Sequence, residues 1–229
     1  MAKIFVIGDI HGCHRKLVTL LGRLPLDRGE DTLVFLGDYI NRGPDSRQVL
    51  DTLIGLERDY PRVIFLKGNH EQALLDYALH GEAEDLGLLR VMGIEATATS
   101  YRASLRRLLD LSCMPPEHQQ FLFDLKCSFT SGDYLFTHAD FDDSLPLPPP
   151  QETAQQRMQR RTVEARLLSS RRMGQEQDLE PKPERVVIFG HLPFATPLVR
   201  ADRIGIDTGA VYGNLLTAVQ LPQRIFYHA

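Results

Sequence analysis

The sequence predicts an α/β fold in which the first strands are parallel and carry helices on the faces of a sheet. Three short apolar segments, residues 3–7, 32–36 and 62–66, each run into a loop that contains glycine and polar or charged side chains. Each loop is followed by a segment whose apolar residues recur at helical spacing. Strand, loop and helix units in series are typical of parallel strands with helices packed on them.

The helices that follow these strands are predicted from periodicity and from their first residues. After the first strand, Leu17, Leu20 and Leu24 recur at helical spacing. The second helix is expected from about Asp45, because Pro44 and Asp45 are residue types that favour a helix start. A third helix is expected over residues 71–79.

The pattern changes after His80. Residues 81–126 contain few strand signals, and segments 104–111 and 117–125 have helical periodicity. We therefore expect a helical cap inserted over about residues 81–126, after which residues 134–137 form a further strand.

Residues 140–184 form a second expected insert, which is rich in proline and arginine. Segment 145–150, LPLPPP, favours extended geometry and solvent exposure. Residues 155–172 are compatible with a helix that has a basic face.

The last part of the chain is rich in strand signals. Residues 185–189 predict a buried strand, and short strands are expected over 204–206, 215–221 and 224–227. These predict antiparallel or mixed pairing. The 229 residues suit one domain that spans 1–229 and includes both inserts.

Composition excludes several classes of partner. Thirty acidic and 26 basic residues give a formal charge of −4, so no basic footprint for nucleic acid is present. The apolar runs are far too short to span a membrane. The N-terminal residues do not resemble a signal peptide, and Cys13, Cys113 and Cys127 indicate free thiols, so we expect a cytoplasmic protein.

The main functional observation is that five expected strands are each followed by side chains that bind hard metals or by imidazoles. The carboxyl ends of strands in α/β sheets line the ligand crevice, so residues far apart in sequence are expected to converge there. Turn chemistry explains glycine, asparagine and aspartate at such positions but does not call for four histidines. These side chains are Asp9, His11, Asp38, Asn69, His70, His138 and His191.

Two carboxylates, one amide oxygen and three imidazoles suit manganese, iron or zinc better than calcium or a cysteine–zinc site. Six ligands exceed the need of one catalytic metal with an open position. They suit two metals about 3.5–4 Å apart that share a carboxylate, lower the pKa of a bridging water and hold phosphoryl oxygens. Arg42, close to Asp38, offers a planar fork for two phosphate oxygens.

Five motifs occur in one order along the chain, namely GDIHG (8–12), GDYINRG (37–43), GNHE (68–71), FTHAD (136–140) and FGH (189–191). With them, the sequence resembles the metal-dependent phosphoprotein phosphatase family, within the calcineurin-like metallophosphoesterase superfamily. The tail IGIDTGAVYGNLLTA (204–218) is similar to bacterial members of the serine/threonine protein phosphatase type.

The resemblance implies a β-sandwich flanked by helices, an αββα arrangement, with the site at its edge. It implies that Asp9, His11 and Asp38 hold a first metal, that Asp38 bridges, and that Asn69, His138 and His191 complete the second site. Two divalent ions are implied, with Mn²⁺ first and iron or zinc as alternatives.

The implied reaction is a single in-line attack by metal-bound hydroxide on a phosphate monoester. His70 would protonate the leaving oxygen as general acid, Arg42 would bind the phosphate, and Asn69 would also face the substrate. His70, Asp38 and Arg42 are therefore the expected catalytic residues.

The sequence departs from the family pattern in three places. Asn41 stands where the family usually has an aspartate that pairs with the general-acid histidine, so we expect His70 to be a weaker acid unless Glu71, Asp140 or another carboxylate substitutes. Asn41 and Asp207 are expected to lie next to the metal ligands without binding the metals themselves. FTHAD carries an acidic residue after its histidine, and the second phosphate-binding arginine has only Arg161 and Arg166 as candidates.

Three functions remain open at this point. The first is a phosphomonoesterase, above all a serine/threonine protein phosphatase, acting on a phosphorylated protein or a small phosphoester. The second is a symmetrical diadenosine tetraphosphate hydrolase, which the run NRGPDS (41–46) favours, whereas Tyr39, Glu71 and the tail favour the first. The third is a non-catalytic scaffold that retains the fold.

Overall fold

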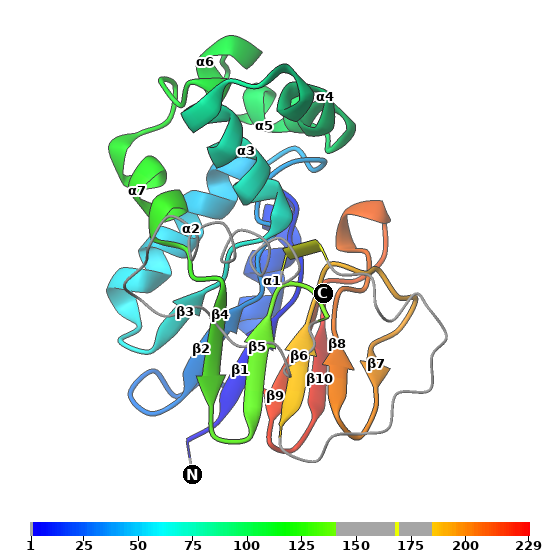
Figure 1. The fold of residues 1–229 in the computed structure, drawn as a ribbon. Helices are drawn as coiled ribbons and strands as arrows, with labels where there is room; N and C mark the ends of the chain where they lie inside the picture. The colour runs from blue at the N-terminus through cyan, green and yellow to red at the C-terminus, as the bar shows by residue number, and fades with distance from the viewer. Residues whose placement is uncertain (1, 141–167, 170–184) are drawn as a thin grey trace, which may run out of the picture.

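A computed structural model describes residues 2–140, 168–169 and 185–229. Most of the proline- and arginine-rich insert, including nearly all of the helix expected over 155–172, lies outside these residues. Two mixed sheets carry the fold and confirm the predicted α/β class (Figure 1).

The first sheet contains the three strands that the sequence predicted to be parallel. Its order is β10-β9-β1-β2-β3; β1 pairs in parallel with β2, and β2 with β3. The two C-terminal strands complete it in antiparallel pairing. The strands are β1 (Ile4–Ile7), β2 (Thr32–Phe35), β3 (Val63–Phe65), β9 (Thr217–Leu221) and β10 (Ile225–His228).

The second sheet has the order β4-β5-β6-β8-β7, with parallel pairs in its centre and antiparallel strands at both edges. Its edge strands are short, and the sequence did not predict them. The strands are β4 (Ser128–Ser131), β5 (Tyr134–Thr137), β6 (Val186–Phe189), β7 (Leu198–Val199) and β8 (Arg203–Gly205).

Strand β1 shows why the central strands consist of continuous runs of apolar residues in the sequence. Val6 lies in the core between the two sheets, where Val34, Ile188 and Val219 also lie. Phe5 and Ile7 face the opposite way, into the core shared with the helices. Because both faces of the strand are buried, apolar residues occupy successive positions and no polar alternation appears.

Helices α1 (His14–Arg23) and α2 (Ser46–Asp59) pack their apolar sides into the same core as Phe5 and Ile7. Helix α3 (Asn69–His80) begins two residues earlier than the sequence predicted. Its first turn therefore includes Asn69 and His70, which places both side chains at a helix start.

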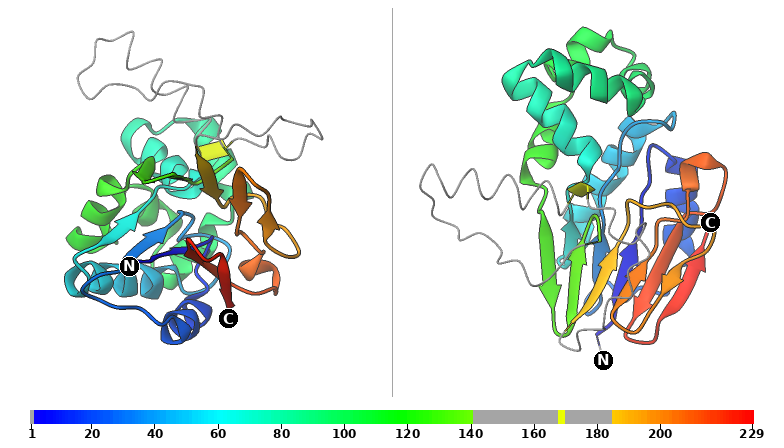
Figure 2. Two further views of the ribbon diagram at one scale, coloured as in Figure 1. Left: turned by 90° about the horizontal axis from the view of Figure 1, so that it is seen from below. Right: turned by 45° about the vertical axis from the view of Figure 1, so that its right-hand side comes forward.

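The helical cap is confirmed, and it lies at one end of both sheets (Figure 2, right). The strands β1, β2, β3, β5 and β6 point their carboxyl ends toward this end of the molecule (Figure 1). The cap consists of α4 (Ala83–Val91), α5 (Ile94–Ser100), α6 (Leu105–Leu109) and α7 (Pro116–Asp124). Within the described residues, no helix combines the length and apolar character needed to cross a bilayer.

Candidate metal centre

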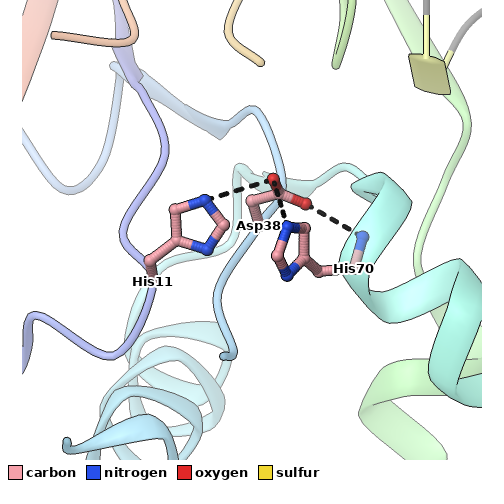
Figure 3. Close-up of side chains that lie close together, drawn as sticks. All are labelled: His11, Asp38 and His70. Carbon is pink, nitrogen blue, oxygen red and sulfur yellow. Dashed lines mark hydrogen bonds and ion pairs between the residues drawn. The ribbon is translucent and has the colours of Figure 1, made fainter. Parts of the chain in front are cut away.

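The carboxylate of Asp38, in the loop after β2, lies at the centre of the site (Figure 3). Its Oδ2 is 3.4 Å from Nε2 of His11 and 3.8 Å from Nε2 of His70. Its Oδ1 is 3.5 Å from Nε2 of His138 and accepts the backbone N–H of His70 at 3.1 Å. The two oxygens of one buried carboxylate therefore serve two different sets of imidazoles.

Two groups of possible metal ligands share Asp38. One group contains His11, Asp38 and His70, the other Asp38, His138 and His191, and within each group the ligand atoms lie within 4.8 Å of one another. The amide oxygen of Asn69 extends the second group, because it lies 3.0 Å from both Nε2 of His138 and Nδ1 of His191. The loops after β1, β2, β5 and β6 and the start of α3 thus meet at one point.

Two of the histidines, His11 and His138, present the nitrogen that a metal requires. The Nδ1–H of His11 donates to the carbonyl oxygen of Ile40 at 3.0 Å, and the Nδ1–H of His138 donates to that of Leu36 at 2.8 Å. Both rings then turn an unprotonated Nε2 toward Asp38. Burial lowers the pKa of His138 to about 4, and burial together with the charge of Arg42 lowers the pKa of His11 to about 3. Both are neutral imidazoles near pH 7, as metal ligation demands.

The buried carboxylates repel one another. Burial, followed by the negative charges of Asp207 and Asp38, raises the pKa of Asp9 well above its usual value. Burial raises the pKa of Asp38 to about 7, although the hydrogen bond from the backbone N–H of His70 and the positive charge of Arg42 both act to lower it. Acids crowded in this way, beside neutral imidazoles, fit divalent cations, which would offset the repulsion.

Asp9, which follows β1, is connected to the centre of the site by hydrogen bonds to the loop after β6. Both of its carboxylate oxygens lie 3.1 Å from the backbone nitrogen of His191, whose N–H they accept, although Asp9 is in neither of the two close ligand groups. A Cβ on Gly190 would lie 2.1 Å from Oδ1 of Asp9. The glycine of the FGH motif therefore allows the two strand ends to approach. Asp207, also buried, bonds the backbone N–H of Gly209 at 2.9 Å.

Glu71 holds the loop that carries Asp38. It is fully buried and accepts the backbone N–H groups of Asp38, Tyr39, Ile40 and Gly68 at 2.8–3.2 Å. Burial and the charge of Asp38 raise its pKa to about 7. A Cβ on Gly68 would lie 2.1 Å from Oδ1 of Asp38, so this loop and the start of α3 require a glycine at their contact.

On the Nδ1 side of its ring, His70 contacts Asn41 and not a carboxylate. Nδ2 of Asn41 lies 3.0 Å from Nδ1 of His70, and both residues are buried. Glu71 is engaged by the backbone, as above, and Asp140 accepts two bonds from Arg203 at 2.7 and 2.9 Å. Neither of the substitutes that the sequence suggested therefore takes the place of the family's aspartate.

Arg42 lies at the mouth of the site. Its Nη1 donates to Nε2 of His11 at 2.7 Å, and its guanidinium lies 5.5 Å from the ring centre of Tyr212. It lines an open pocket of about 610 Å³ together with Asn69, His70 and His191. Arg161 and Arg166, the candidates for a second phosphate-binding arginine, lie outside the described residues.

The loops of the site contain unusual backbone geometry. Left-handed φ angles are rare for residues other than glycine and cost on the order of 1–3 kcal/mol each. Five site residues adopt them, namely His11 (45°), Asp38 (53°), Asn41 (70°), Arg42 (63°) and His191 (66°). Such strain persists only where the surrounding contacts fix the loop, and it often accompanies function.

Comparisons with known proteins agree with this site. The family model for calcineurin-like phosphoesterases matches residues 2–213, so the chain belongs to that family and is a hydrolase. The chain is 29% identical to serine/threonine-protein phosphatase 1 of Salmonella typhimurium, over 95% of this chain and 91% of the relative.

A second relative and a solved structure bear other descriptions. The chain is 26% identical to the asymmetrical bis(5'-nucleosyl)-tetraphosphatase of Oceanobacillus iheyensis, over 98% of this chain and 90% of the relative. It is also similar to the crystal structure of a candidate diadenosine tetraphosphatase, with a TM-score of 0.68 and 23% identity, covering 100% of this chain and 93% of that one. The family and hydrolase class are thus fixed, while the relatives differ in substrate.

Proposed function

We propose that this chain is a phosphoesterase that hydrolyses phosphate monoesters with two divalent metal ions, and that its substrates are serine/threonine phosphoproteins. The observation that carries the proposal is the sharing of Asp38 by two groups of ligand atoms. One carboxylate placed between two ligand sets is what a pair of adjacent cations requires.

We assign Asp9, His11 and Asp38 to the first ion, and Asp38, Asn69, His138 and His191 to the second. Mn²⁺ is our first choice and iron or zinc are alternatives, because the set contains oxygen and imidazole donors and no thiolate. When bound, such ions lower the pKa of the attacking water and neutralise charge on the phosphoryl oxygens.

The chain's own groups supply the remaining steps. Arg42 is exposed, and its Nη1 donates to Nε2 of His11, the nitrogen assigned to the first ion. With that ion bound, this N–H and the other donors of the guanidinium would be left for phosphate oxygens. His70 lines the same pocket and is assigned to donate a proton to the leaving oxygen. Asn69, also in the pocket wall, contributes to holding the phosphate.

The charges around the pocket favour a peptide over a polyphosphate. Among the described lining residues, Arg42 is the only lysine or arginine, and Asp76 and Asp85 are carboxylates. A dinucleoside tetraphosphate carries several negative charges that need cationic partners, whereas a phosphorylated side chain needs one main site. Whole-length similarity does not separate the two substrates, since it is found both for a serine/threonine-protein phosphatase and for a bis(5'-nucleosyl)-tetraphosphatase.

A second candidate is a diadenosine tetraphosphate hydrolase, symmetrical or asymmetrical, and Asn41 favours it. A neutral amide beside His70 suits a leaving group that needs little protonation, such as a nucleotide anhydride. A non-catalytic scaffold, the third alternative, has less support because the chain belongs to a hydrolase family and retains every predicted ligand.

The discriminating experiment uses the full chain loaded with Mn²⁺. We expect higher kcat/KM on a phosphoserine peptide than on diadenosine tetraphosphate. Faster hydrolysis of the dinucleotide would overturn the substrate assignment, and its products, two ADP or ATP with AMP, would identify the cleavage mode. Absence of bound metal by elemental analysis would overturn the metal assignment itself.

The acid can be tested at Asn41. Asn41→Asp supplies a carboxylate to Nδ1 of His70 and favours imidazolium. We expect the ratio of phosphopeptide to aryl phosphate hydrolysis to rise by about tenfold, within the range of effects of residues that support a catalytic group. An unchanged ratio would show that Asn41 does not limit the acid.

We further propose that residues 1–229 act as one domain in the cytoplasm, without a nucleic-acid or membrane partner.

A further inference from the structure

The helical cap contacts the loop that carries Asn41, the residue beside His70. The backbone N–H of Asn41 donates to Oγ1 of Thr97, a residue of α5, at 2.9 Å, although the two lie 56 positions apart. The backbone N–H of the next residue, Arg42, donates to the carbonyl oxygen of Gly93 at 3.2 Å. Two of the left-handed residues of this loop, Asn41 and Arg42, are therefore held by the segment that leads into and forms α5.

Thr97 also bonds the side chain of Asn41. Its Oγ1–H donates to Oδ1 of Asn41 at 2.8 Å, while the same Oγ1 accepts the Asn41 backbone N–H. Ser46 lies 3.1 Å away and donates to Thr97, because the single hydroxyl hydrogen of Thr97 is already used. Asn41, Ser46 and Thr97 are all fully buried, so water does not compete for these bonds.

The orientation of the Asn41 amide decides where His70 carries its proton. With Oδ1 on Thr97, the NH₂ group faces Nδ1 of His70 at 3.0 Å, so Nδ1 accepts and the ring proton is on Nε2. That Nε2–H points toward Oδ2 of Asp38, 3.8 Å away. The opposite amide orientation would put the proton on Nδ1 and turn a lone pair of Nε2 toward the same carboxylate, which is electrostatically worse.

We propose that Thr97 is a positioning residue that, through the Asn41 amide, orients the His70 ring so that Nδ1 accepts a hydrogen bond and Nε2 carries the ring proton. This inference rests on the proposed function and adds which atom of His70 faces the site with a proton: Nε2–H, oriented by the cap through an amide where the family usually has a carboxylate. Proton donation counts most for substrates whose leaving oxygen needs protonation, so the hydroxyl of Thr97 is expected to matter most for these substrates.

The first test is nitrogen NMR of the histidine rings in the full-length protein, without metal and with Zn²⁺, which is diamagnetic. The His70 signals are assigned by their loss in His70→Gln. We expect Nε2 to be protonated and Nδ1 unprotonated. A proton on Nδ1 in the unaltered protein overturns the proposal.

The second test removes the hydroxyl. Thr97→Val keeps the shape of the side chain but leaves the Asn41 amide without its anchor, so we expect a mixture of both ring tautomers. The rate on a phosphoserine peptide should fall by about tenfold, and that on an aryl phosphate by less than about threefold. Thr97→Ser, which retains the hydroxyl, should restore both readouts. Thr99→Val makes the same exchange on the exposed side of α5, where the hydroxyl bonds only a backbone carbonyl, and should change neither.

The outcomes separate this inference from the proposed function. An unaltered His70 spectrum in a folded Thr97→Val protein overturns the positioning role of Thr97. Failure of Thr97→Ser to restore the spectrum overturns it as well. If Thr97→Val does not fold, Asn41→Asp must move a proton onto Nδ1, and an unchanged spectrum there overturns it equally. Expected spectra combined with no hydrolysis of any phosphoester would overturn the proposed function and leave the positioning role of Thr97 in place.

Discussion

The two sides of Asp38 differ in how fully the protein satisfies its own polar groups. On the side of the proposed general acid, called the acid side below, His70, Asn41, Thr97 and Ser46 form a buried chain in which donors face acceptors. On the metal side, the unprotonated Nε2 of His138 lies 3.0 Å from the amide oxygen of Asn69, and buried carboxylates raise one another's pKa.

This difference indicates that the acid side is assembled by the protein alone, whereas we expect the metal side to be completed by cations. Lone pairs that face one another at close range, next to crowded carboxylates, destabilise the chain until positive charge is placed between them. Metal binding is therefore expected to act on stability as well as on catalysis, and to do so through one side of the site.

The largest effect is expected for Asp38→Asn, which removes the shared carboxylate. Activity should fall by more than about a thousandfold, since each electrostatic contribution at such a centre is worth ~10²–10³ in rate. The same change removes a repelling charge, so the metal-free variant should unfold at a higher temperature, by about 2–4 °C per kcal/mol gained.

Calorimetry with and without Mn²⁺ measures both effects. The unaltered protein should gain about 2.7 kcal/mol of stability at a hundredfold excess of metal over its Kd, and Asp38→Asn should lose most of this gain. Asp59→Asn, at the exposed end of α2, is the matched control and should behave as the unaltered protein. A metal-free Asp38→Asn protein that is less stable than the parent would contradict the idea that the metal side is destabilised by its own charges.

The next effect in size is expected for His70→Gln, which disables the acid side. Hydrolysis of a phosphopeptide should fall by ~10²–10⁴, while an aryl phosphate, whose leaving group needs little protonation, should lose far less. His70 also lies among the possible ligands of the first group, so the metal-dependent gain in unfolding temperature is the discriminating readout. An unchanged gain assigns His70 to proton transfer, and a lost gain would reassign it to the metal.

The smallest effect is expected for Tyr212→Ala, beside Arg42 in the wall of the pocket. The ring of Tyr212 is 64% exposed and lies 5.5 Å from the Arg42 guanidinium. Exposed contacts of this kind contribute about 0.5–1 kcal/mol, which corresponds to about two- to fivefold in KM if Arg42 binds phosphate. Steady-state kinetics measures it, and Tyr212→Phe, which keeps the ring, should retain the parent KM. Equal values for all three proteins would show that Tyr212 does not position Arg42.

The sequence predicted the parallel start of the first sheet and the helical cap, because buried strands and amphipathic helices have a periodicity that local residues express. It did not predict the edge strands β4 and β7 or the separate helices α4 and α5, which are short and carry weak patterns. The candidate ligand residues could be singled out as a group from the sequence, since each follows a recognisable strand or starts a helix. Their roles in the reaction remain predictions.

The sequence by itself thus determined which side chains end the strands and which chemistry they suit. Only the tertiary structure decided which of them meet. It paired Asp140 with Arg203, turned Glu71 onto four backbone N–H groups, and gave His70 an amide anchored by Thr97. No local pattern encodes the contact between Thr97 and Asn41, because it joins a cap helix to a strand-end loop and exists only once both have packed on the same core.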